Sequence, residues 1–275
     1  MDKEILKSRR AKKLLLIAFG LSGMAALIYE VIWTRLLILI FGSTTYAVST
    51  MLASFMAGLA IGSWFIGKRV NRIHNLYKTF AYLELGIGIY GLLFIFLLGV
   101  LQSPFALIYE SFHNSFFLFT IAQFLLIFLV MVIPTTMMGA TFPVVSKIFV
   151  RDMNYLGKDI SHVYSVNSLG AVVGPILAGF ILVPLIGITK TNIFAAVINI
   201  GIAFMILNKD KLKLYTILLF IPLLLIPYIS PLPVYGNIFF LRGTSSGEET
   251  KNLIQNLDFL FYKEGAYSTV TVIDK

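Results

Sequence analysis

The chain has 275 residues, of which 58% are hydrophobic and 13% are charged, and it contains no cysteine. This composition excludes an ordinary soluble domain, because the apolar residues fall in runs of about 20, the length at which a helix crosses the hydrocarbon layer of a bilayer. The lack of cysteine excludes disulfides, thiol nucleophiles and thiolate metal sites.

Seven transmembrane helices are predicted in chain order, at 14–41, 46–67, 80–101, 115–138, 163–186, 191–207 and 214–230. The first run is too long for the apolar segment of a signal peptide, so we expect it to be retained. The sixth run is short, and Pro222 and Pro227 interrupt the seventh. The expected fold class is an all-α polytopic membrane bundle of about seven helices with a short C-terminal β-hairpin.

The formal net charge is +9, and the basic residues that produce it lie mainly in every second loop between the predicted spans. Basic residues gather before the first span and after the second, fourth and sixth, at Lys3, Lys7, Arg9, Arg10, Lys12, Lys13, Lys68, Arg69, Arg72, Lys78, Lys147, Arg151, Lys158, Lys209, Lys211 and Lys213. The short loops between the other spans hold Lys190. This alternation is the positive-inside pattern. It predicts a multi-pass protein of the cell membrane with a cytoplasmic N-terminus, and a lipid partner rather than nucleic acid.

Small residues recur on one face of two spans. Ser54, Gly58 and Gly62 share a face of the second span, and Gly170 and Gly174 share one of the fifth. Such faces let two helix backbones approach closely in lipid. We expect them to be packing surfaces, and a sliding seam in a transporter is the alternative.

Two further segments carry local signals. Residues 134–143 (PTTMMGATFP) predict a helix that ends, turns and restarts as a short interfacial segment around 143–150. Residues 231–258 read as a linker, and 259–275 alternate around Gly265 as a strand, turn and strand. An isolated hairpin is marginally stable, so we expect this segment to begin a larger domain that follows the transmembrane domain 1–230.

Ionisable residues inside the spans are the candidates for function. Glu30 and Arg35 lie five apart in the first span and so point about 140° away from each other. Glu30 is therefore expected to pair across helices, or to form a cation or proton site. Arg35 and Trp33 are alternatively an anchor at the outer interface. Glu84, in the third span, is expected to snorkel or to pair with Lys78.

Aromatic and amide groups complete the candidate intramembrane polar site. Tyr29, Trp33 and Tyr82 could attract a cation through their ring faces, together with Glu30 and Glu84. Asn167 is expected to bond a neighbouring helix. His74, His113 and His162 are mutually distant in sequence, so no metal site is predicted, and no catalytic constellation can be assembled.

Several motifs resemble the transmembrane spermidine synthase-like proteins, in which a major-facilitator-like membrane region is fused to an aminopropyltransferase domain. They follow the family's order along the chain, at 22–37 (SGMAALIYEVIWTRLL), 41–49 (FGSTTYAVS), 58–64 (GLAIGSW), 134–143, 164–174 (YSVNSLGAVVG) and 261–272 (FYKEGAYSTVTV). The last of these is similar to the opening β-segment of the enzyme domain.

The resemblance implies transfer of an aminopropyl group from decarboxylated S-adenosylmethionine to an amine such as putrescine. The chain ends before the region that would bind these molecules, so the resemblance assigns no catalytic or cofactor residue here, and Ser268 stands where soluble spermidine synthases carry glutamine. The expected role is membrane anchoring and supply of a polyamine or other small cation, with the catalytic domain absent.

Two other roles stay open. A stand-alone secondary transporter or half-transporter would need paired repeats, and no second copy of the 22–64 pattern is evident. A scaffold would instead hold a soluble aminopropyltransferase subunit at the membrane.

Overall fold

The computed structural model describes residues 9–41, 45–150, 153–207, 258–264 and 269–274. These segments contain the long helices α1 (Arg9–Phe41), α2 (Thr45–Arg69), α3 (Leu76–Phe112), α4 (Phe116–Phe149), α5 (Leu156–Ile176) and α6 (Val183–Ile206). Shorter elements are the 3-10 turns η2 (Val70–Arg72) and η3 (Met153–Tyr155) and the π-helical segment η4 (Leu177–Leu182). Two strands, β1 (Asp258–Glu264) and β2 (Thr269–Asp274), pair antiparallel.

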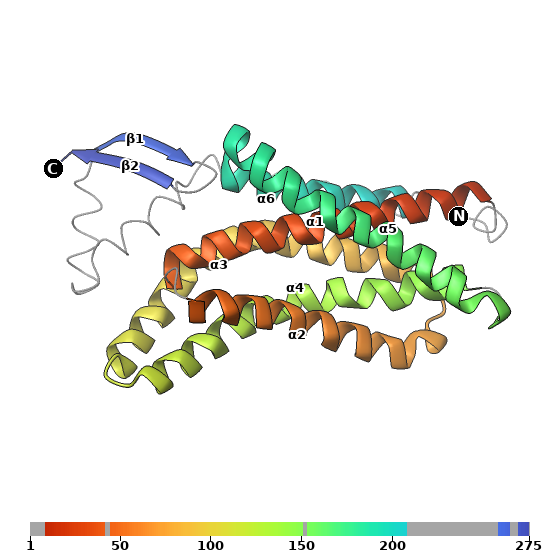
Figure 1. Cartoon of the computed structure of the whole chain (residues 1–275), viewed down its shortest axis with the longest axis horizontal. Helices are drawn as coiled ribbons and strands as arrows, with labels where there is room; N and C mark the ends of the chain where they lie inside the picture. The colour runs from red at the N-terminus through yellow and green to blue at the C-terminus, as the bar shows by residue number, and fades with distance from the viewer. Residues whose placement is uncertain (1–8, 42–44, 151–152, 208–257, 265–268, 275) are drawn as a thin grey trace.

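The predicted spans 14–41 to 191–207 correspond to these helices. Five stretches of the described helices are long and apolar enough to cross a membrane, which fits a multi-pass membrane protein. The predicted span 214–230 lies outside the described residues, so the number of seven spans stays a prediction. The helices form an elongated bundle in which segments distant in sequence lie side by side (Figure 1).

The last apolar stretch, Leu156–Ile206, is 51 residues long. A straight helix of that length would extend for about 76 Å, whereas the hydrocarbon layer is about 30 Å thick. The chain reverses within it at Gly187, whose backbone has φ 82° and ψ 171°. Only glycine adopts this conformation readily, so Gly187 divides the stretch into two legs that run in opposite directions (Figure 1).

The prediction that a helix ends and restarts around 134–150 is wrong. Helix α4 continues without a break through Pro134 and Pro143 to Phe149. Proline has no backbone N–H, so Pro134 leaves the carbonyl of Val130 without its usual helical donor. The Tyr90 hydroxyl of α3 donates to that carbonyl across 2.6 Å. A neighbouring helix thus supplies the missing hydrogen bond, which is how membrane helices tolerate proline.

The small-residue faces are packing surfaces, as predicted. A Cβ atom on Gly170 or Gly174 would collide with the backbone of Gly20 or Met24, which brings α5 into close contact with α1. The residue numbers of the contacting pairs increase together along α1 and α5, so these two helices run parallel.

The same kind of contact joins α2 and α4. The positions of Gly58 and Gly62 face Thr135 and Thr136, and Gly139 faces the backbone of Leu59. These helices are also parallel, and the absence of side chains at the three glycines allows the close dispersion contact that stabilises helix pairs in lipid.

The contacts between helices have an internal symmetry. The contact of α1 with α5 corresponds to the contact of α4 with α2. The contact of α3 with α4 corresponds in the same way to that of α6 with α1, and α3 also contacts α6. Exchanging the first three helices with the last three leaves this pattern unchanged. The exchanged helices run in opposite directions, since consecutive helices alternate. The most extensive contacts of the described helices are therefore arranged as in two halves of inverted topology.

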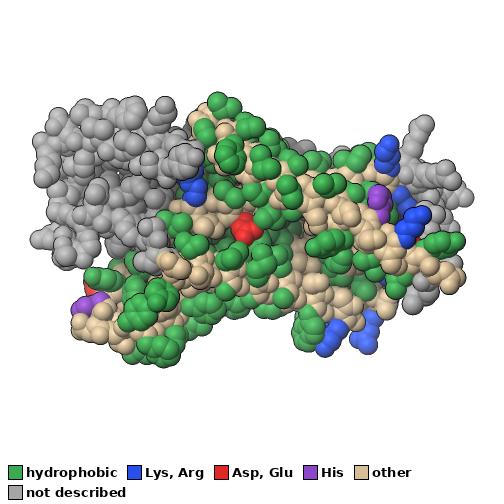
Figure 2. Space-filling view, viewed as in Figure 1, with side chains coloured by type: hydrophobic (Ala, Val, Ile, Leu, Met, Phe, Trp, Pro, Cys, Tyr) green, Lys and Arg blue, Asp and Glu red, His purple; other side chains and the backbone are tan. Residues whose placement is uncertain are grey.

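The described basic side chains lie mainly at the end of the bundle that carries the N-terminus, while hydrophobic side chains cover most of its length (Figure 2). At that end, Lys68 lies over the Trp64 ring at 4.0 Å and Arg69 over the Phe65 ring at 3.9 Å. Cations over aromatic faces are typical of the zone where a bilayer meets water.

Candidate functional site

Glu84 of α3 lies in the interior of the bundle, with no part of its side chain exposed. Both carboxylate oxygens accept hydrogen bonds from other helices. The Ser22 hydroxyl of α1 donates to Oε1 across 2.6 Å, and the Asn199 amide of α6 donates to Oε2 across 2.7 Å. Three helices therefore meet at this carboxyl group.

A second polar link joins the same three helices further along the bundle. The Trp33 indole N–H of α1 donates to Oδ1 of Asn192 across 2.9 Å, and Nδ2 of Asn192 donates to the Gly91 carbonyl of α3 across 2.7 Å. Asn192 is fully buried, and both ends of its amide have a partner. This link holds α1, α3 and α6 in register.

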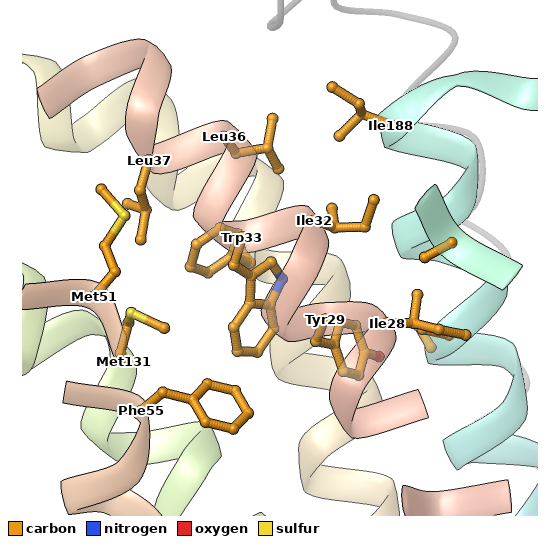
Figure 3. Packing of buried hydrophobic residues seen from close by; sticks show 14 of the residues in the cluster. Ile28, Tyr29, Ile32, Trp33, Leu36, Leu37, Met51, Phe55, Met131 and Ile188 are labelled. Atoms are coloured by element: carbon orange, nitrogen blue, oxygen red, sulfur yellow. The ribbon is translucent and has the colours of Figure 1, made fainter. Parts of the chain in front are cut away.

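Aromatic rings fill the space between the two links. Trp33 stacks on Phe94 with ring centroids 4.5 Å apart, and Tyr29 lies 4.7 Å from Trp33 on the preceding turn of α1 (Figure 3). The Tyr29 hydroxyl lies against Gly91, where any side chain would collide with it. This hydroxyl is buried without a hydrogen-bond partner and lies within electrostatic reach of Glu84.

The structure brings together three of the predicted site residues, namely Glu84, Tyr29 and Trp33. Two expectations about them are wrong. Glu84 neither snorkels nor pairs with Lys78, because it points into the bundle toward Ser22 and Asn199. Trp33 is not an interfacial anchor, because it is fully buried and bonded to Asn192.

The other predicted residues lie apart from this cluster. Glu30 is half-buried on α1, and its Oε2 atom has no hydrogen-bond partner, so no pairing across helices is seen for that oxygen. Arg35 is also half-buried on α1. Asn167 lies against Gly23 at the contact between α1 and α5. Tyr82 is 46% exposed, so it does not face the buried aromatic rings.

Sequence reasoning missed the residues that complete the cluster, which are Ser22, Asn192 and Asn199. A signal was present, since the two asparagines lie seven residues apart in an apolar span and so share one helix face. Their partners in α3, Gly91 and Glu84, are also seven apart and come in the reverse order, because α3 and α6 run antiparallel.

The described residues contain no group of three or more His, Asp or Glu side chains that could hold a metal ion. The cluster places the Ser22 hydroxyl beside a carboxylate, but both groups are enclosed by the bundle. It can instead bind, hold or release a small positive charge, because it centres on a carboxyl group whose described partners are neutral hydrogen-bond donors.

The five long apolar helical stretches fit a multi-pass membrane protein. No protein-family model and no solved structure matches the chain. The chain is similar to the polyamine aminopropyltransferase of Leptospira interrogans serogroup Icterohaemorrhagiae serovar copenhageni (strain Fiocruz L1-130), with 26% identity over 177 residues. The match covers 64% of this chain and 32% of that protein. This distant relationship supports a likeness to spermidine synthases.

Proposed function

We propose that the chain is the membrane-embedded region of a polyamine aminopropyltransferase-like protein, which it anchors in the cell membrane and supplies with an amine substrate. The observation that carries the proposal is the 26% identity to the Leptospira polyamine aminopropyltransferase. The apolar helices agree with the anchoring role. In this proposal the N-terminus is cytoplasmic. It lies at the basic end of the bundle, and the cytoplasmic loops of membrane proteins carry the excess of Lys and Arg.

The strands β1 and β2 would then be the first strands of the aminopropyltransferase domain. They pair in antiparallel register from Asp258 opposite Asp274 to Glu264 opposite Thr269. The transfer reaction, from decarboxylated S-adenosylmethionine to an amine such as putrescine, would be carried out by a domain or subunit beyond this chain's described residues.

Antibodies against residues 243–256 test this proposal in membranes of the source cell. The immunoprecipitated native product should transfer the aminopropyl group to putrescine. Its band should exceed the 30.7 kDa of this chain by the mass of a further domain of about 100–250 residues, or a separate catalytic subunit should co-precipitate. An inactive precipitate with neither a larger band nor a partner would contradict the proposal.

Glu30 is the candidate for attracting the amine. A carboxylate on a membrane helix is costly unless it serves a polar partner or ligand, and Glu30 has an oxygen without a hydrogen-bond partner. Labelled putrescine or spermidine should bind the purified chain in vesicles, and Glu30→Gln should reduce that binding. Glu110→Gln, at an exposed acidic residue near the end of α3, is the matched control. Equal binding by both variants would exclude Glu30 from this role.

The inverted symmetry of the helix contacts supports a second candidate, a secondary half-transporter for a polyamine or small cation. Many transporters are built from two inverted halves that rock about a central site. Here α3 and α6 are the corresponding helices of the two halves and contact each other. Glu84 of α3 lies at this contact, where Asn199 of α6 bonds it. Uptake of labelled putrescine into vesicles that contain this chain alone would favour transport, and binding without uptake would favour the anchoring role.

A further inference from the structure

The hydrogen bonds around Glu84 are incomplete in a way that identifies what the site lacks. Asn199 uses its N–H to bond the carboxylate, and its own carbonyl oxygen is buried without a donor. The Tyr29 hydroxyl is buried without any partner. Asn199 is 1% exposed and Tyr29 is fully buried, so bulk water does not satisfy these atoms. A buried acceptor without a donor loses its hydration without compensation, which destabilises the fold.

The charge around Glu84 is also unbalanced. Its described partners, Ser22 and Asn199, are neutral, and no Lys, Arg or His of the described segments contacts the carboxylate. Tyr29 is the buried titratable group of α1 within electrostatic reach of Glu84, and α6 presents the Asn199 amide. On its own helix the nearest basic residue is Lys78, which is exposed. A carboxylate buried in a bilayer without a cation is expensive and normally becomes neutral or binds a cation.

We propose that Glu84 is a proton-binding site, which holds one exchangeable proton at the meeting point of α1, α3 and α6. The proton comes from a hydronium ion of the solvent, whose O–H bond breaks to leave a water molecule as one O–H bond forms on the carboxylate. The acid then offers a donor that the cluster lacks, for the Asn199 carbonyl or the Tyr29 hydroxyl. The same step removes the buried negative charge. This role goes beyond anchoring and substrate supply, and it stands whether or not an aminopropyltransferase domain is attached.

A proton fits the site better than an alkali ion. The two groups that contact the carboxylate point hydrogen atoms at it, with donor–acceptor distances of 2.6 and 2.7 Å. These donors stabilise the ionised carboxylate, so the proton is favoured instead by the burial of that charge away from water and from any described cation. A metal cation is usually held by several oxygen ligands, carboxylates above all, and no second carboxylate of the described residues joins Glu84 in this cluster.

Infrared spectroscopy of the full chain tests the proposal. The protein is purified in dodecyl maltoside, which has no ester carbonyl, and spectra are recorded at neutral pH in H₂O and D₂O. The neutral carboxylic acid should give a carbonyl stretching band that moves to lower frequency in D₂O. Glu84→Gln should abolish this band. Glu30→Gln, at the half-buried carboxyl group on α1, should leave it unchanged.

A second variant keeps the test decisive if Glu84→Gln does not fold, as judged by circular dichroism and gel filtration. Ser22→Ala retains the carboxyl group but removes one donor, so the band should persist at a higher frequency. The proposal is overturned if the band survives Glu84→Gln, or if Ser22→Ala leaves its frequency unchanged. It is also overturned if added Na⁺ removes the band at constant pH, because an alkali ion would then occupy the site.

Discussion

Asn199 donates its side-chain amide to Oε2 of Glu84 across 2.7 Å, although 115 residues separate the two in the chain. The bond joins α6 to α3, and the bond from Ser22 joins the same carboxyl group to α1. Helix position and site chemistry therefore depend on the same contacts. A substitution that disturbs this carboxyl group should change both the packing of three helices and the properties of the site.

Asn199→Ala should lower the free energy of unfolding by about 1–2 kcal/mol, since hydrogen bonds between membrane helices and the cost of an unmet buried group are of this size. Reversible unfolding in mixed detergent micelles measures the change. Asn71→Ala, at an exposed position in η2, is the control and should have little effect. In a double-mutant cycle, the effects of Asn199→Ala and Glu84→Gln should be less than additive. Strict additivity would mean that the two side chains do not interact.

The two tryptophans should behave differently. Trp33→Phe leaves Oδ1 of Asn192 without its donor and should destabilise the fold by about 1–2 kcal/mol. Trp64→Phe replaces the indole of a residue that is 61% exposed and should be nearly neutral. Fluorescence quenching by brominated lipids provides an independent measurement, since Trp64 should be quenched strongly and Trp33 weakly. Equal quenching would contradict the burial of Trp33.

Gly139→Ala should loosen the contact between α2 and α4. A Cβ atom there would overlap the backbone of Leu59, which cannot move without displacing the whole helix. Overpacking of this kind costs about 1–3 kcal/mol, which a detergent unfolding curve would record. Gly201→Ala is the matched control, because its Cβ would meet no atom within 4 Å. Alanine has the higher helix propensity, so this control should be neutral or stabilising by up to about 1 kcal/mol.

Gly187→Ala should strain the chain reversal near the start of α6. The φ angle of 82° disfavours any residue with a Cβ atom, and a cost of about 1–3 kcal/mol is expected. The variant should show a lower midpoint of thermal unfolding, while Gly179→Ala, in the π-helical segment where a Cβ meets nothing within 4 Å, should not. An unchanged midpoint in Gly187→Ala would mean that the chain reverses elsewhere.

The orientation in the membrane can be tested cleanly because the chain contains no cysteine. Single cysteines at Arg72 and Lys158 should react with a membrane-impermeant reagent only from the cytoplasmic side. Cysteines at Asn114 and Lys190 should react only from the other side. All four positions are exposed. Labelling of Arg72→Cys and Asn114→Cys from the same side would contradict both the orientation and the crossing of α3.

Much of the helical architecture could be predicted because it depends on local properties of the chain. Apolar runs longer than about 20 residues predict helices that can span a bilayer. The small-residue faces that include Gly58 and Gly170 predict close helix contacts, and both are packing surfaces in the structure. These features follow from composition and spacing, which need no knowledge of which helix adjoins which.

The partners of each polar residue depend on which helices are neighbours, and therefore only the folded bundle determines them. From the sequence, Glu84 is close to Lys78, yet its carboxylate is bonded by Ser22 and Asn199 from other helices. Continuity of α4 through Pro134 likewise depends on Tyr90, 40 residues away from the carbonyl it bonds. A buried polar group takes whichever partner the packing brings within hydrogen-bond distance, and that distance is a property of the three-dimensional arrangement alone.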